Sequence, residues 1–171
     1  MAEHTDLDAN LAFTEHDHHH CSGEVLARAE ALSAERGVRL TPVRRRTLEI
    51  LLESHKALGA YEVLDRLAGE GFGKQPPVAY RALDFLVDQG LVHRINRLNA
   101  FAACMHPGEN YAAAFLICRA CNSLAETPAA RMRAVLEAEA QLQGFRVERA
   151  NIEALGLCPG CAAVDAGQTT P

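Results

Sequence analysis

The 171-residue chain has no long apolar run and no basic N-terminal flank. No stretch approaches the roughly 18 apolar residues that a membrane span needs. The first 24 residues contain six acids and no lysine or arginine, whereas a secretory signal needs a basic flank before an apolar segment. The sequence therefore predicts a cytoplasmic protein without a membrane partner. A reducing compartment also favours metal binding over disulfides for paired cysteines.

The usual signatures of a catalytic site are missing as well. The sequence shows no nucleophile with a neighbouring base, no glycine-rich phosphate loop and no paired catalytic carboxylates. We therefore expect a protein that is not an enzyme.

Two Cys-X-X-Cys pairs account for four of the six cysteines. Two intervening residues let one tight turn present both sulfurs to one ion, and four thiolates form the closed, soft shell that zinc prefers. The sequence therefore predicts a structural zinc bound by Cys118, Cys121, Cys158 and Cys161. The 36 residues between the pairs exceed the roughly 15 to 20 of a compact zinc ribbon, so the ion closes a loop that has its own secondary structure. Two reactive dithiols or two local disulfides are the alternatives.

The net charge of −5 is unevenly distributed along the chain. Residues 1–24 carry −6, residues 25–100 carry +3 and residues 101–171 carry −2. The middle section includes Arg44, Arg45 and Arg46 in a row. It therefore has the local positive charge that contact with phosphates requires.

Residues 25–104 have the pattern of a small domain with helices first and strands last. Apolar spacing predicts helices over residues 25–37, 42–52, 61–70 and 78–89, and strands over 91–95 and 100–104. Three helices, an exposed fourth helix and a hairpin form a winged helix-turn-helix, in which the fourth helix enters the DNA major groove. A helical domain with an accessory hairpin is the alternative.

The remaining segments predict a hinge, a second domain and two loose ends. Residues 105–112 are the expected hinge, and residues 113–163 are expected to form strands at 113–117 and 122–127, a helix from Pro128 to Gly144, and one or two more strands before Cys158. A unit this short buries too little apolar surface to be stable alone. We therefore expect a bound metal ion and self-association to stabilise it. Residues 1–24 predict a disordered acidic tail, whose cluster from His16 to Cys21 either binds metal weakly or is solvated. Residues 164–171 predict a loose C-terminus.

Several short stretches resemble the ferric uptake regulator superfamily, and its zinc uptake regulator branch most closely. They are Arg39-Leu40-Thr41-Pro42-Val43-Arg44, Ala60-Tyr61, Pro76-Pro77-Val78-Ala79-Tyr80-Arg81-Ala82-Leu83, Gln89-Gly90-Leu91-Val92-His93 and the two cysteine pairs. The resemblance covers roughly residues 25–161. It implies an α+β homodimer with an N-terminal winged-helix DNA-binding domain and a small C-terminal α/β dimerisation domain that carries the four-cysteine zinc. It also implies that the metal-loaded dimer represses zinc uptake genes by binding palindromic operators in double-stranded DNA.

The resemblance implies a second, regulatory zinc ion in each chain. His93, Cys104 and Glu126 match positions that bind regulatory zinc in the resembled branch, and His106 is the nearest candidate for a fourth ligand, ahead of Glu109. A thiolate in the set favours zinc over iron. A half-buried histidine, an inert core thiol and a solvated acid are the alternative interpretations.

The expected DNA contacts follow from the exposed side of the fourth helix and from the resemblance. Arg81 is the expected guanine reader, and Tyr80 is expected to hold a phosphate or pack on a thymine methyl group. The other expected contacts are Tyr61, Arg44, Arg45 and Lys74.

This chain also departs from the pattern of its relatives at two places. Pro77-Val78-Ala79-Tyr80-Arg81 lacks a threonine that relatives usually have at the start of this helix. The segment from Glu109 to Ala114 lacks the histidines that relatives place before the first cysteine pair.

Three other functions remain open at this point. An iron or peroxide sensor of the same superfamily would share the fold. A thiol-disulfide oxidoreductase would use a Cys-X-X-Cys pair, but the expected thioredoxin-like βαβ context is not seen. A zinc carrier would hand over metal through its histidine-containing N-terminus.

Overall fold

The computed structural model describes residue 13 and residues 18–109 and 112–168. The chain divides into two compact units, an N-terminal unit over residues 15–109 and a C-terminal unit from residue 110 onward. The boundary between them falls inside the range expected for the hinge. Among the described residues, no helix is long and apolar enough to cross a membrane.

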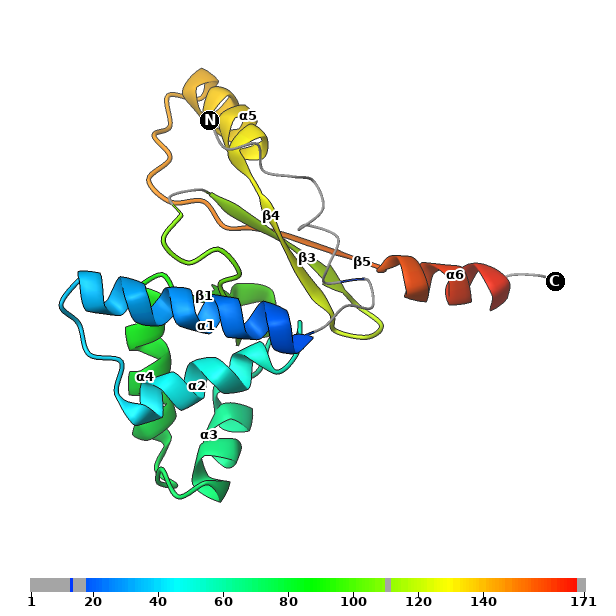
Figure 1. Ribbon diagram of the computed structural model, residues 1–171. Helices are drawn as coiled ribbons and strands as arrows, with labels where there is room; N and C mark the ends of the chain where they lie inside the picture. Colours follow the sequence, from blue (N-terminus) through cyan, green and yellow to red (C-terminus); the bar gives the residue numbers. More distant parts are fainter. Residues whose placement is uncertain (1–12, 14–17, 110–111, 169–171) are drawn as a thin grey trace. The chain divides into compact units, whose positions relative to one another are not determined.

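The N-terminal unit consists of four helices followed by a two-stranded hairpin (Figure 1). Its elements are α1 (His18–Glu35), α2 (Pro42–Leu52), α3 (Ala60–Gly69), α4 (Pro76–Asp88), β1 (Val92–Ile95), the 3₁₀ turn η2 (Asn96–Leu98) and β2 (Ala100–Ala103). The strands are antiparallel, with Val92 opposite Ala103 and Ile95 opposite Ala100. The predicted winged helix-turn-helix is confirmed.

Local sequence explains where the central helices begin and which sides they bury. Pro42 and Pro76 start α2 and α4, where a missing backbone N–H costs nothing. The apolar stripes of α2, α3 and α4 meet in one core together with the first residues of the hairpin. Its fully buried side chains include Leu48, Leu51, Val63, Leu67, Leu83, Leu86 and Leu91. This core holds the exposed side of α4 in a fixed orientation.

Helix α1 begins at His18, so the expectation of a disordered tail up to residue 24 is wrong for residues 18–24. Val25 and Ala29 of α1 are buried in the core. Once these contacts nucleate the helix, extending it by further residues is inexpensive, even without apolar spacing. His16, Asp17 and the side chains from His18 to Cys21 lie outside the described part, so the role of that cluster stays a prediction.

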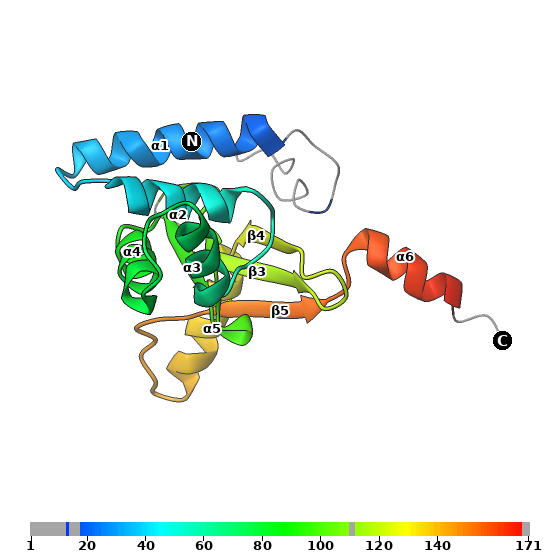
Figure 2. The same cartoon turned by 90° about the horizontal axis from the view of Figure 1, so that it is seen from below.

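The C-terminal unit contains a three-stranded mixed sheet and two helices (Figures 1 and 2). Its elements are β3 (Ala113–Cys118), β4 (Leu124–Pro128), α5 (Ala130–Leu142), β5 (Ile152–Gly156) and α6 (Pro159–Gln168). The sheet order is β4-β3-β5, with β3 antiparallel to β4 and parallel to β5. The region before Cys158 thus supplies one strand. The C-terminus expected to be loose from residue 164 is helical through Gln168, because Pro159 is well placed to open a helix.

Candidate metal centre and nucleic-acid interface

The sheet brings the two cysteine pairs to one edge. Strands β3 and β5 are parallel neighbours, and Cys118, the last residue of β3, lies opposite Gly156, the last residue of β5. The Arg119 backbone N–H donates to the Gly156 carbonyl across 2.9 Å, which extends this pairing beyond the strands. Because parallel strands end at the same edge, the turn after β3 and the segment after β5 meet there.

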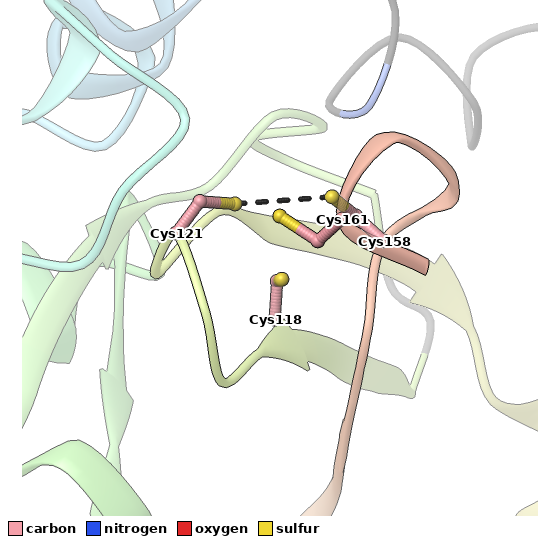
Figure 3. A group of neighbouring side chains, drawn as sticks. All are labelled: Cys118, Cys121, Cys158 and Cys161. Carbon is pink, nitrogen blue, oxygen red and sulfur yellow. Dashed lines mark hydrogen bonds between the residues drawn. The ribbon is translucent and has the colours of Figure 1, made fainter. Parts of the chain in front are cut away.

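The four thiol groups converge on a common centre (Figure 3). Their Sγ atoms all lie within 4.8 Å of one another, and the Cys121 and Cys158 sulfurs are 3.8 Å apart. A tetrahedral ion with Zn–S bonds of about 2.3 Å places its sulfurs about 3.8 Å apart. All four cysteines are free thiols, in contrast to the alternative of two local disulfides. The cluster therefore fits a four-thiolate zinc ion.

Hydrogen-bond donors around the first pair favour the thiolate form. The backbone N–H of Cys158, followed by those of Cys121 and Ala120, lowers the pKa of Cys118 to about 6. The Ser123 hydroxyl lies 3.1 Å from the Cys121 sulfur and lowers the pKa of that thiol. These donors prepare the first two ligands for a cation.

The last thiol in the cluster shows why a cation is needed. The neighbouring sulfur of Cys158, followed by those of Cys118 and Cys121, raises the pKa of Cys161 to about 12. Negative charges this close repel one another, so the group keeps a proton unless a positive ion replaces it. The arrangement thus has the chemistry of a metal site.

Two of the predicted regulatory ligands lie together on the hairpin. His93 in β1 lies opposite Ala102 of β2. Cys104 comes two residues after Ala102, just beyond the end of β2. Residues in this diagonal relation share a face of an antiparallel pair and are within reach of one another. A ring nitrogen of His93 and the Cys104 sulfur lie within 4.8 Å. The Cys104 backbone N–H donates to the Leu91 carbonyl across 3.0 Å and continues the pairing.

The other two candidates lie elsewhere in the chain. His106 follows the hairpin in the N-terminal unit, with its Nδ1 atom 3.9 Å from a Glu109 carboxylate oxygen. Glu126 is in the middle of β4 in the C-terminal unit, opposite Phe115. The four candidates are therefore divided between the two units.

The predicted reading face of α4 is exposed. Ala79, Ala82, Leu83 and Leu86 form its buried stripe. Tyr80 is 40% exposed, and Arg81 is exposed beside it. Tyr61, at the start of α3, is 63% exposed, and its ring meets the Tyr80 ring edge-on with 6.5 Å between centroids. The structure thus places Tyr61 and Tyr80 side by side, with Arg81 exposed at the next position of α4 and Lys74 exposed just before α4.

The row of three arginines in α2 is engaged within the N-terminal unit. Arg45 bonds Glu30 across 2.7 Å and also pairs with Glu49. Arg46 pairs with Glu70 of the segment that follows α3. The guanidinium carbon of Arg44 lies 3.5 Å from the centroid of the Phe85 ring in α4. These partners were not predicted from the sequence. The spacing of Arg45 and Glu49 signals a helix pair, whereas the others are distant in the sequence.

Comparisons with known proteins agree with this geometry. Residues 35–155 match the model of the ferric uptake regulator family. A zinc uptake regulation protein of Escherichia coli (strain K12) is 37% identical over 144 residues, which cover 84% of each chain. A solved structure of a zinc uptake regulator complexed with zinc and DNA has a TM-score of 0.79 at 36% identity, covering 85% of this chain and 97% of that one. The crystal structure of holo XcZur has a TM-score of 0.74 at 40% identity, covering 83% and 99%.

Proposed function

Because this chain belongs to the ferric uptake regulator family, we propose that it is a zinc-responsive repressor that binds palindromic operators of zinc uptake genes as a metal-loaded homodimer. One observation carries the proposal: a winged helix with an exposed reading face and a convergent four-thiol cluster occur in one chain that is 36% identical to a regulator solved with both zinc and DNA. Such a protein is a regulator that acts on DNA in the cytoplasm, without an enzymatic reaction.

Each chain holds one structural zinc ion through Cys118, Cys121, Cys158 and Cys161. Bound there, the ion supplies positive charge that keeps all four thiols ionised. The four cysteines join the end of β3 to the start of α6, which stabilises a unit with a small core of its own.

Self-association is supported by the apolar surface of the C-terminal unit. Val135 and Leu142 of α5 are 64% and 79% exposed, and Phe145 after α5 is 64% exposed. Strand β5 forms one edge of the sheet, and its Leu155 is 45% exposed. A second copy that presents the same surface covers these side chains in a two-fold symmetric dimer.

His93, Cys104 and Glu126, with His106 as the fourth ligand, form the proposed regulatory zinc site. Support comes from the shared face of His93 and Cys104 on the hairpin and from the soft thiolate, which suits zinc better than iron. Glu126 belongs to the other unit. An ion bound by ligands from both units would limit how the units move relative to one another.

This restriction links metal binding to DNA binding. A dimer has two copies of α4, which must match two half-sites at a fixed spacing. Arg81 reads guanine edges, Tyr61 and Tyr80 complete the reading surface, and Lys74, Arg44 and Arg45 are the candidate phosphate contacts. A complete switch needs a preference of about 10⁴-fold for the DNA-competent arrangement, and a weaker preference gives graded repression.

The deciding experiment combines metal analysis with DNA binding by the full-length protein. We expect two zinc ions per chain at saturation and one after mild chelation, with specific DNA binding present only in the first state. The DNA is a duplex selected from a randomised pool by the zinc-loaded protein. Anaerobic titrations with iron and manganese test the rival iron sensor: operator binding that follows iron rather than buffered zinc would refute the proposal.

A further inference from the structure

Arg44 is partly buried, and its guanidinium group makes two contacts. The group stacks on the Phe85 ring, with 3.5 Å between its central carbon and the ring centroid. Its Nη1 atom donates to the Arg39 carbonyl across 2.8 Å. A separation of 3.5 Å is van der Waals contact, so the ring covers one face of the guanidinium. The first turn of α2 is thereby joined to the last turn of α4.

The contact is close to the residue expected to read bases. Phe85 follows Arg81 by four positions, so the two side chains occupy neighbouring places on the surface of α4. Phe85 is partly buried against the core, whereas Arg81 is exposed. Any rotation or tilt of α4 that broke the stack would also move Arg81.

Bidentate recognition of a base tolerates little movement. Functional side chains must be held within about 0.5 Å and 10 to 20° of their working geometry. The buried stripe of α4 consists largely of alanine and leucine, which pack without directional bonds. On the flank toward the hairpin, Asp84 bonds Arg94 across 3.3 Å, but both side chains are about half exposed. The rings of Tyr61 and Tyr80 also meet edge-on, but these side chains are 63% and 40% exposed. Of these three contacts, the one between Arg44 and Phe85 is the most buried, because both residues are partly buried.

We infer that Arg44 is a positioning residue: it fixes the orientation of α4, so that Arg81 meets the base edges, rather than serving mainly as a phosphate contact. The inference rests on the proposed DNA-binding function. It differs from the expectation that Arg44 holds a phosphate, and the two roles respond differently to substitution. A phosphate contact needs a positive charge, whereas the stack needs a planar cation above an aromatic ring.

Two substitutions separate these roles. Arg44→Lys keeps the charge and removes the planar group, and Phe85→Leu keeps an apolar side chain and removes the ring. Arg28→Lys in α1 and Phe72→Leu after α3 are the matched controls, because neither residue contacts α4 through a stacked pair. Binding of zinc-loaded full-length variants is measured on the selected duplex and on a random duplex, over a series of salt concentrations. Urea unfolding establishes that each variant is folded under these conditions.

We expect Arg44→Lys and Phe85→Leu each to weaken binding to the selected duplex about 5-fold, as loss of a partly buried cation–π contact should. Random-duplex binding should change less than about 2-fold, and the salt dependence should stay unchanged, because no phosphate contact is lost. The double variant should be no weaker than either single variant, since both remove the same contact.

Several results would overturn the inference. Wild-type specific binding by Arg44→Lys would show that charge alone suffices. Equal weakening on both duplexes, or losses that multiply in the double variant, would show that the two residues act separately. If Arg44→Lys does not fold, Phe85→Leu against Phe72→Leu decides the question alone. Failure of the wild-type protein to select any duplex would instead refute the proposed function, and this inference with it.

Discussion

Arg46 and Glu70 form a bidentate ion pair between α2 and the end of α3. The Arg46 Nε atom lies 2.6 Å from one carboxylate oxygen, and Nη2 lies 2.7 Å from the other. Arg46 also bonds Glu53, which in turn pairs with Arg66. The parallel geometry of a guanidinium and a carboxylate makes this the most specific kind of surface ion pair. It ties α2 to the end of α3 at their solvent-exposed side.

This pair should make stability depend on pH in the acid range. The hydrogen bond from Arg46 lowers the pKa of Glu70 below its ordinary value of 4.5. A lowered pKa means that the stabilisation is fully present above the unfolded-state value and is lost as the pH falls through the folded-state value. We therefore expect Glu70→Gln to lower the urea midpoint at pH 7, and the difference from wild type to shrink as the pH falls below about 4.5. Asp65→Asn, at an exposed acid within α3, is the control. A constant difference across this range would show that the pair does not titrate as described.

Replacing a structural zinc ligand should dismantle the C-terminal unit. Cys121→Ser removes one of four thiolates from a cluster whose sulfurs lie within 4.8 Å of one another. We expect loss of one zinc ion per chain and of the dimer, measured by metal analysis and sedimentation, because a unit this small depends on its metal. A stable dimer with full zinc content in this variant would contradict the proposed role of the cluster.

The hairpin thiol should behave differently. Cys104→Ser should keep the folded dimer and its structural zinc but abolish the zinc dependence of DNA binding, because a soft ligand is lost only from the regulatory set. The measurement is a titration of operator binding against buffered free zinc. An unchanged zinc response would remove Cys104 from the regulatory site.

The exposed apolar side of α5 should be the place where dimerisation is most sensitive to charge. Val135 is 64% exposed in the single chain. Val135→Glu places a carboxylate in the proposed interface twice, once from each subunit, so we expect the dimer dissociation constant to rise by at least about 100-fold, or about 3 kcal/mol. Glu139→Gln on the same helix is the control. Sedimentation that shows both variants as wild-type dimers would place the interface elsewhere.

Much of the fold could be predicted because it is encoded in local patterns. Apolar spacing located α2, α3 and α4 to within one or two residues, although α4 begins at Pro76, two residues before the expected start at Val78. The Cys-X-X-Cys spacing specified the chemistry of the metal cluster before any geometry was known. Helix α1 was different, because the residues before Val25 lack apolar spacing and are helical only as an extension of a packed segment.

By itself, the sequence determined the periodicity of the helices, the two thiol pairs and the two short strand segments of the hairpin, since each depends on neighbours within a turn or a strand. Only the tertiary structure decided which distant groups meet. It placed β3 beside β5, which brings the thiol pairs together, and it paired Arg46 with Glu70 and Arg44 with Phe85. The charge of these arginines suggested phosphate contact. Their actual partners depend on how whole helices pack together, and no local sequence pattern shows which helices will be neighbours.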